Sequence, residues 1–320
     1  MNISAGIPED AFDYYKYHGL GNDYLVISPR VFGSSLPPAA VRAICDRHRG
    51  PGGDGILLGP LPAEEIGASA GASAGASAGD VPALRIYNPD GSEGEKSGNG
   101  LRIFIRHLWE QGLAPGRRFD IATRGGMVSA QVLDETGARI AVGMGRLSFQ
   151  SAALPMTGPS REVLGEKLSV GGGEWSINCV SVGNPHCVVL LEPGQDPSES
   201  LARRIGPELE NHPLFPNRTN VQFLRVLDEH SIRIEIWERG AGYTQASGTS
   251  SCAAAGVAVR LGLCSSPVTV NMPGGSLEIR FDDGFNTHME GAVSPVNAGR
   301  FHDEFLSGIS LRRRLGSPPA

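Results

Sequence analysis

The sequence lacks the features that mark secreted, membrane and nucleic-acid-binding proteins. Only five of its 320 residues are cysteine, an odd number without a C-x-x-C pair, which predicts buried thiols in a reduced, cytoplasmic protein. No apolar run is long enough to span a bilayer. Residues 1–10 show no basic region followed by an apolar core, so no secretory signal is expected. A net charge of −6 without a basic stripe argues against nucleic acid as a partner.

What the chain does contain is a repeated loop. Residues 93–100 (EGEKSGNG) and 243–250 (YTQASGTS) each place a serine and a glycine immediately before a helical run. These serines, Ser97 and Ser247, lie 150 positions apart, which suggests a duplicated unit. A helix N-terminus presents unpaired N–H groups and the positive end of the helix dipole, so it suits a carboxylate. The two loops therefore predict one site for a small acid.

The order of predicted elements indicates an α+β fold. Short alternating strands, one helix and more strands occur twice, and neither a G-x-G-x-x-G after a strand nor a Walker motif is present. The expected helices cover 101–113 and 251–263, and the second is apolar on nearly all sides, as in a helix wrapped by a sheet. The expected domains are 1–145 with 290–320, and 146–289. Residues 67–79, rich in Gly, Ala and Ser, are expected to form a flexible, dispensable insertion.

Six short motifs, in this order along the chain, resemble those of the diaminopimelate epimerase family. They are 19–24 (GLGNDY), 88–93 (NPDGSE), 97–100 (SGNG), 183–187 (GNPHC), 238–242 (ERGAG) and 247–249 (SGT). The resemblance covers most of the chain outside the insertion and the tails. It implies two pseudo-symmetric domains, each a mainly antiparallel sheet around a central helix, with the site in the cleft between them. It also implies a cofactor-free enzyme, without a metal, that interconverts LL- and meso-diaminopimelate for lysine and cell-wall synthesis.

The family's reaction explains the repeated loop. One residue removes the α-proton and another returns a proton on the opposite face, and in the family both are cysteines. Here the two positions are Ser97 and Ser247, and a hydroxyl is a far weaker acid than a thiol. If the two-base reading holds, their oxygens should face each other at about 6–8 Å, given the reach of a proton-transfer contact. Cys252, further along the second helix, is expected to fill core space.

The resemblance also assigns roles to polar residues. His186 would influence protonation of the reacting pair, Glu238 would hold the α-ammonium, and Arg239 would hold a carboxylate. Backbone N–H groups would bind the α-carboxylate, and asparagines would hydrogen-bond the substrate. The N–H donors are Gly98, Asn99, Gly248 and Thr249, and the asparagines are Asn22, Asn88, Asn99, Asn184 and Asn220. Two departures stand out: Gly55 and Tyr243 occupy positions where relatives carry glutamine and glutamate.

Three functions stay open on this sequence. The first is the epimerase, with a small amino acid as its partner, no nucleic acid or membrane partner, and a homodimer as the candidate assembly. The second is an amino-acid-binding homologue that has lost proton transfer, which the serine pair favours. The third is a racemase or isomerase of another amino acid, such as a proline-type imino acid.

Overall fold

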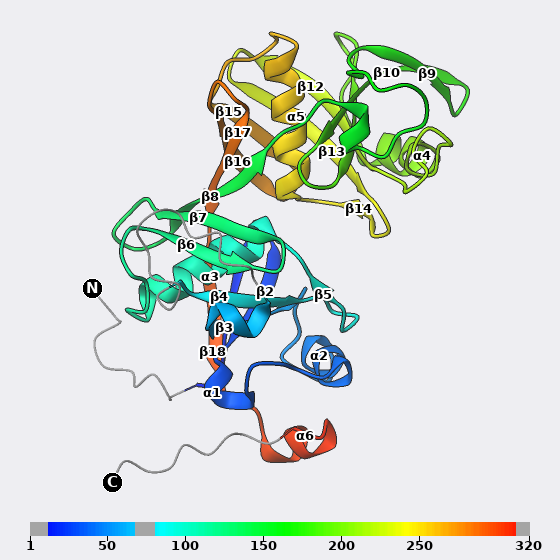
Figure 1. The fold of residues 1–320 in the computed structure, drawn as a ribbon. Coiled ribbons are helices and arrows are strands. Elements are labelled where there is room, and N and C mark those ends of the chain that lie inside the picture. The colour runs from blue at the N-terminus through cyan, green and yellow to red at the C-terminus, as the bar shows by residue number, and fades with distance from the viewer. Residues whose placement is uncertain (1–11, 68–80, 312–320) are drawn as a thin grey trace. The chain divides into compact units, whose positions relative to one another are not determined.

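The computed structural model describes residues 12–67 and 81–311 (Figure 1). The insertion expected at 67–79 lies outside these ranges except for Gly67. The chain divides into two compact units, one of Met1–Val142 with Ala292–Ala320 and one of Gly143–Gly291, here called unit 1 and unit 2. No helix in the described ranges has the length and apolar character of a membrane span.

Unit 1 is a sheet with a long helix, α3, and short flanking helices (Figure 1). Its strands are β1 (Tyr14–Gly19), β2 (Asn22–Ile27), β3 (Ile56–Leu61), β4 (Ala83–Tyr87), β5 (Glu93–Gly94), β6 (Arg118–Thr123), β7 (Gly126–Val132), the start of β8 (Arg139–Arg146) and β18 (Ser294–Gly299). Its helices are α1 (Pro29–Phe32), α2 (Pro38–Cys45), η1 (Ala63–Ile66), α3 (Gly98–Glu110) and α6 (Asp303–Gly308). The pairs β2–β3 and β4–β6 are parallel, whereas β18–β1, β1–β2, β3–β4, β4–β5, β6–β7 and β7–β8 are antiparallel.

Unit 2 repeats this plan. Its strands are β9 (Glu166–Val170), β10 (Gly173–Ser181), β11 (Pro185–Leu190), β12 (Asn220–Asp228), β13 (Ser231–Glu238), β14 (Gly242–Thr244), β15 (Val268–Met272), β16 (Gly275–Phe281) and β17 (Asn286–Ala292). Its helices are η2 (Ser151–Ala153), α4 (Glu199–Glu210) and α5 (Gly248–Arg260). Again two pairs, β11–β12 and β13–β15, are parallel, and the other pairs of the unit are antiparallel.

The strand registers make the two units equivalent residue by residue. Leu25 pairs in parallel with Ile56, and Cys187 pairs in parallel with Val221. In unit 1, Ile56 pairs with Tyr87, and Tyr87 pairs with Glu93. In unit 2, Val221 pairs with Trp237, and Trp237 pairs with Tyr243. Each serine then follows four residues later. The equivalent positions are therefore Tyr24 and His186, Gly55 and Asn220, Asn88 and Glu238, and Ser97 and Ser247.

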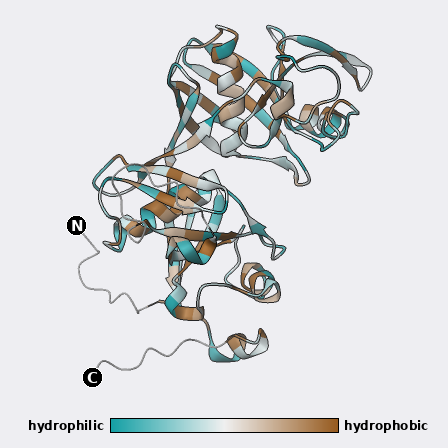
Figure 2. Ribbon diagram, viewed as in Figure 1, coloured by the Kyte–Doolittle hydropathy of each residue, from teal (hydrophilic) through white to brown (hydrophobic). Residues whose placement is uncertain are grey.

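A buried helix forms the centre of each unit. Helix α3 contacts β1, β2 and β7, and helix α5 contacts six strands of unit 2. The apolar residues of α3, such as Ile103 and Phe104, are fully buried, and the hydrophobic colouring of this helix is visible in Figure 2. Helix α5 needs no polar face, because strands surround its Ala- and Val-rich sequence. The predicted α+β class, with two units that each place strands around a central helix, is confirmed.

Both central helices begin three residues earlier than the sequence predicted. Helix α3 starts at Gly98 and helix α5 at Gly248, so that Ser97 and Ser247 are the N-cap residues. Each serine has extended backbone angles, and its side chain accepts a hydrogen bond from the N–H group three residues on. This is the usual way in which serine caps a helix, and it extends the helix back over a glycine.

Candidate active site

In unit 1, Ser97 is held by a backbone donor and a phenol. Its Oγ accepts a hydrogen bond of 3.0 Å from the N–H of Gly100. The same Oγ lies 3.2 Å from the hydroxyl of Tyr24 on β2, and either group can be the donor. The serine side chain is thus fixed at the mouth of α3, where N–H groups of the first turn are directed out of the helix.

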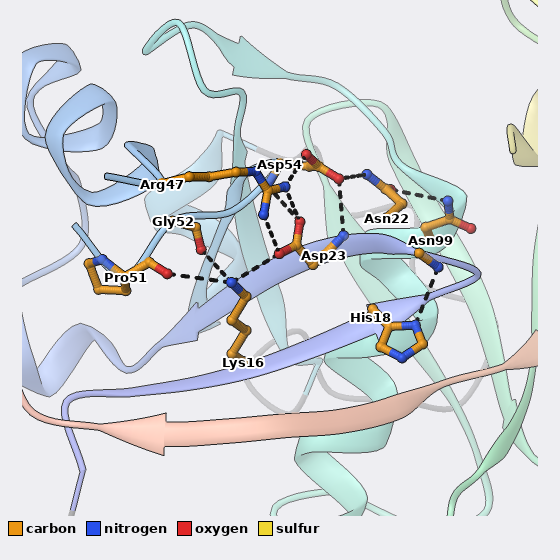
Figure 3. Close-up of polar contacts among 10 residues, drawn as sticks. Lys16, His18, Asn22, Asp23, Arg47, Pro51, Gly52, Asp54 and Asn99 are labelled. Carbon is orange, nitrogen blue, oxygen red and sulfur yellow. Dashed lines mark hydrogen bonds and ion pairs between the residues drawn. The ribbon is translucent and has the colours of Figure 1, made fainter. Parts of the chain in front are cut away.

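Two of the predicted asparagines lie together in the same unit (Figure 3). Asn99 donates through Nδ2 to Oδ1 of Asn22 at 3.1 Å. Asn22 in turn donates to a carboxylate oxygen of Asp54 at 3.0 Å. Behind Asn99, the fully buried Arg102 donates to its Oδ1 at 2.7 Å. These hydrogen bonds fix the orientation of both side-chain amides: the oxygen of each accepts a hydrogen bond, and the nitrogen of each donates one.

A charged cluster supports this pair, and sequence reasoning missed it. Asp23 forms ion pairs with Arg47 at 2.6 Å and with Lys16 at 3.0 Å (Figure 3). Arg47 forms a second ion pair with Asp54 at 2.7 Å. Burial alone would raise the pKa of Asp23, but the hydrogen bonds and charges of Arg47 and Lys16 lower that pKa to about 2. The signal available in the sequence was Asp54 in the glycine-rich loop 50–55, but nothing there paired it with Lys16 or Arg47.

Asn88 lies in the turn between β4 and β5, apart from the Asn22–Asn99 pair. Its Nδ2 donates to the Ser92 hydroxyl at 3.0 Å, and its backbone N–H donates to the Ser92 carbonyl at 2.9 Å. The side chain is half-buried and keeps its turn closed. Within the described ranges, no hydrogen bond joins the Asn88 side chain to the other predicted residues of unit 1.

In unit 2, Ser247 is capped more loosely than Ser97. Its Oγ lies 3.5 Å from the N–H of Ser250 and 3.5 Å from the hydroxyl of Thr249. Only 8% of Ser247 is exposed. Its backbone carbonyl accepts from the hydroxyl of Ser251 at 2.9 Å, one turn along α5.

His186 is fully buried at the start of β11. Its Nε2 lies 3.0 Å from Oδ1 of Asn184, so these two predicted residues are in contact. Burial lowers the pKa of His186 to about 3; a hydrogen bond with Gln222 acts against this, and the charge of Arg239 adds to it. The imidazole is therefore neutral near pH 7. Gln222, which sequence reasoning missed, also donates to the hydroxyl of Ser250 at 3.0 Å and so links β12 to the first turn of α5.

Asn220 joins two loops of unit 2 through its own amide. Its Nδ2 donates to the carbonyl of Pro185 at 2.9 Å, and its Oδ1 accepts from the N–H of Arg239 at 3.0 Å. The guanidinium of Arg239 donates to the carbonyl of Asn217 at 3.3 Å. Glu238 is half-buried, and burial raises the pKa of its carboxyl group.

Each serine loop is tied to a hairpin at the same place. The carbonyl of Glu95, two residues before Ser97, accepts from the N–H of Gly125 at 3.0 Å. The carbonyl of Gln245, two residues before Ser247, accepts from the N–H of Gly274 at 2.9 Å. A side chain at Gly125 would come within 2.9 Å of the Glu95 carbonyl oxygen. The hairpins β6–β7 and β15–β16 thus hold the two loops in the same way.

The two departures noted in the sequence have structural partners. Gly55 lies against Tyr24, because a Cβ at this position would be 2.6 Å from Cε1 of that ring. Tyr243 donates to Glu235 at 2.8 Å, and the guanidinium of Arg203 lies over its ring at 4.8 Å. The expectation that the two serine loops face each other stays a prediction.

The site residues thus form sets within each unit. Ser97, Asn22 and Asn99 lie at the N-terminus of α3, and His186 contacts Asn184 as Asn220 contacts Arg239. The N-terminal N–H groups of Gly98, Asn99, Gly248 and Thr249 belong to the first turns of two helices of 13 residues each. Such a first turn binds an anion and stabilises negative charge that develops beside it.

Comparisons with known proteins place this geometry in a family. The profile of the diaminopimelate epimerase family matches residues 14–150 and 178–296. A protein named diaminopimelate epimerase 2, from Nostoc sp., is 49% identical over 92% of this chain and 97% of its own length. Diaminopimelate epimerase from Pelotomaculum thermopropionicum is 37% identical over 90% of this chain and 98% of its own length.

Solved structures share the fold at low identity. A hydroxyproline epimerase from Agrobacterium vitis aligns with a TM-score of 0.59 and 16% identity, covering 89% of this chain and 90% of that one. A probable proline racemase from Agrobacterium radiobacter gives 0.61 and 15%, covering 91% and 92%. These two show the fold alone, whereas the profile and the sequence relatives confirm the resemblance seen in the motifs: this chain belongs to the diaminopimelate epimerase family.

Proposed function

We propose that this protein is a cofactor-independent isomerase that interconverts LL- and meso-diaminopimelate by proton transfer at the α-carbon, a step in lysine and peptidoglycan precursor synthesis. The observation that carries the proposal is the pair of equivalent serines, Ser97 and Ser247, each capping the buried central helix of its unit. Relatives up to 49% identical over nearly the whole chain bear the name of this activity.

The chemistry assigns one proton-transfer group to each unit. One serine oxygen takes the α-proton, the electron pair stays on the α-carbon and its carboxylate, and the other serine returns a proton to the opposite face. The N–H groups of Gly98, Asn99, Gly248 and Thr249 stabilise the negative charge that grows on the carboxylate. The positive helix ends act in the same direction.

The remaining predicted residues bind the amino acid. Asn22, Asn88, Asn99 and Asn184 offer amide groups, and Arg239 offers a guanidinium for a carboxylate. The Glu238 side chain makes no hydrogen bond among the described residues, so its carboxylate is available for the α-ammonium. Asn220 acts by positioning Arg239 through their 3.0 Å contact. Neutral His186 positions Asn184 rather than exchanging a proton.

A second function, binding of the amino acid without proton transfer, is favoured by one observation. Both positions at which the family carries cysteine are serine here. A neutral hydroxyl is a poor base, so a protein with the same pocket could retain the ligand and lose the reaction. A racemase for proline-type imino acids has weaker support, because that likeness is to structures only 15–16% identical.

One experiment separates these functions. The purified protein is incubated with LL-diaminopimelate in heavy water, α-deuterium is followed by NMR, and binding is measured by calorimetry on the same sample. The variant carrying both Ser97→Ala and Ser247→Ala is the control. Exchange in the parent and none in the control supports the epimerase. Binding without exchange in the parent supports the binding function, and neither binding nor exchange excludes both.

We also infer a cytoplasmic location and a homodimeric assembly. The location is supported by the five cysteines, all free and buried. Light scattering on the purified protein measures the assembly, and a monomeric mass at micromolar concentration would contradict the dimer.

A further inference from the structure

Tyr24 contacts one of the two candidate proton-transfer serines. Within the described ranges, no other tyrosine hydroxyl forms a hydrogen bond with Ser97 or Ser247. The Tyr24 hydroxyl lies 3.2 Å from Oγ of Ser97, although the two residues are 73 positions apart. Only 6% of Tyr24 is exposed, so its ring is held by the core of unit 1 and its hydroxyl has a defined place. The contact is thus built by the fold and not by chance proximity along the chain.

Gly55 makes room for this ring. A Cβ at position 55 would lie 2.6 Å from Cε1 and 3.0 Å from Cδ1 of Tyr24, and 2.5 Å from the Tyr87 carbonyl oxygen. Contacts below 3.0 Å require one partner to move, so a larger residue at this position would shift the Tyr24 ring, the Tyr87 backbone or both. The small residue and the large one therefore form a matched pair.

The bonding of Ser97 leaves a proton path to Tyr24. A serine hydroxyl has one hydrogen to donate and two lone pairs that accept. One lone pair takes the N–H of Gly100 at 3.0 Å. Of the remaining lone pair and the hydroxyl hydrogen, one forms the hydrogen bond with Tyr24, and the other is left for a second partner.

Proton affinity decides what this contact can do. A free phenol is a far stronger acid than an alkyl hydroxyl, which resembles water. When the Tyr24–Ser97 pair has lost one proton, the negative charge therefore rests mainly on the phenol oxygen and not on Ser97 Oγ.

We propose that Tyr24 holds and supplies the proton of Ser97, so that the two hydroxyls work as a relay in the reaction inferred above, on which this proposal rests. In the forward step, the α-carbon–hydrogen bond breaks and its proton joins Ser97 Oγ. At the same time the Ser97 hydroxyl proton passes to the Tyr24 phenolate, and the electron pair stays on the α-carbon. On the opposite face Ser247 gives its hydroxyl proton to the α-carbon, so after one turnover Tyr24 carries an extra proton and Ser247 lacks one. Exchange with solvent water then removes the proton from Tyr24 and returns one to Ser247, which restores the starting charges. Tyr24 acts on the substrate only through Ser97.

Unit 2 provides the internal contrast. His186 occupies the position equivalent to Tyr24, but its Nε2 contacts Asn184 and not Ser247. Ser247 Oγ meets Thr249 and the N–H of Ser250, both at 3.5 Å. The relay therefore belongs to unit 1.

The first test is Tyr24→Phe, with Tyr87→Phe as its matched control. Tyr87 is also a buried tyrosine of unit 1, and its hydroxyl accepts from the N–H of Leu36 at 3.2 Å. Tyr24→Phe should lower kcat for diaminopimelate epimerisation at least tenfold with little change in KM, and should remove the alkaline rise of kcat, whereas Tyr87→Phe should leave both. In a protein carrying Ser97→Cys, a thiol needs no relay, so at a pH where the introduced thiol is fully ionised adding Tyr24→Phe should cost less than twofold. An equal loss in both backgrounds would overturn the relay, because a purely structural role gives that result.

A second measurement does not depend on enzyme activity. The thiol introduced by Ser97→Cys is alkylated with iodoacetamide across pH and followed by peptide mass spectrometry, which separates it from the five native cysteines. A phenol that donates to this thiolate lowers its pKa, so adding Tyr24→Phe should slow alkylation at pH 7 about tenfold. An unchanged rate would overturn the proposal. If the parent shows no exchange, the proposed function fails, and a slowed alkylation would still support the contact that carries this inference.

Discussion

The two serine loops occupy equivalent places, yet the groups around their oxygens differ. Ser97 is capped at 3.0 Å and touches a tyrosine at 3.2 Å, whereas Ser247 has two partners at 3.5 Å, both from its own loop and helix. The backbone devices, an N-cap and a hairpin glycine, are the same in both units. The two units thus share the N-cap and the backbone contact that fixes each serine loop. The residue next to the serine differs, since Tyr24 contacts Ser97 and its equivalent His186 does not contact Ser247.

The helices behind the loops differ as well. Five residues beyond each serine stand Arg102 in α3 and Cys252 in α5, and both are fully buried. Helix α3 uses its arginine to hold Asn99, whereas α5 is lined by alanine and valine and packs against strands on all sides. At this position α3 therefore contributes a polar contact to the site of its unit, whereas α5 contributes apolar packing.

Removing either serine should have the largest effect. Ser97→Ala and Ser247→Ala should each lower epimerisation about 10²–10⁴-fold, the usual contribution of general acid–base catalysis. Each variant should still exchange the α-proton of the one epimer that faces the remaining serine. NMR in heavy water, started separately from the LL and meso isomers, measures this. Equal loss of exchange from both isomers in both variants would argue against one base per unit.

The helix comparison predicts unequal costs for two buried substitutions. Arg102→Met removes a charged hydrogen bond to Asn99 and should lower the free energy of unfolding by about 1.5–3 kcal/mol. Cys252→Ala, at the equivalent position, should cost only about 1 kcal/mol. Urea denaturation of both variants checks this. A larger loss for Cys252→Ala would contradict the contrast between a polar contact and apolar packing.

Each unit buries one histidine whose pKa is low, so acid should weaken both. Burial lowers the pKa of His107 in α3 and of His186 to about 3. The folded pKa lies below the ordinary value of 6.5, so the unfolded chain binds more protons in this range, and stability is lost as the pH falls from about 6.5 towards 3. His107→Gln and His186→Gln should each flatten the fall in melting temperature between pH 7 and pH 4. A variant with an unchanged slope would show that its histidine does not contribute.

The smallest effect expected is at Glu238, whose equivalent in unit 1 is the uncharged Asn88. Burial raises the pKa of Glu238 above its ordinary value of 4.5, so the folded state binds its proton more tightly. Ionisation of this group therefore lowers the free energy of unfolding as the pH rises above about 4.5. Glu238→Gln should melt slightly higher than the parent at pH 7 and equally at pH 4. Calorimetry at the two pH values tests this, and Asn88→Asp provides the reverse change in unit 1.

Much of the fold could be predicted because its signals are local. Alternation of polar and apolar residues marks the strands, and the apolar runs after each serine lie where α3 and α5 form. The short helices α1 and α6 were missed, because four to six residues carry too little periodicity to detect. Motif order named the family and most candidate residues, since those residues sit in contiguous loops.

The sequence by itself determined the duplicated plan, the serine that precedes each central helix and the family, because all three are recorded in short contiguous segments. Only the tertiary structure decided which groups stand behind them. Tyr24 meets Ser97 across 73 positions, and Asn22 meets Asn99 across 77. Such contacts depend on strand register and on space left by a glycine at position 55, and neither is visible until the sheet has formed around the helix.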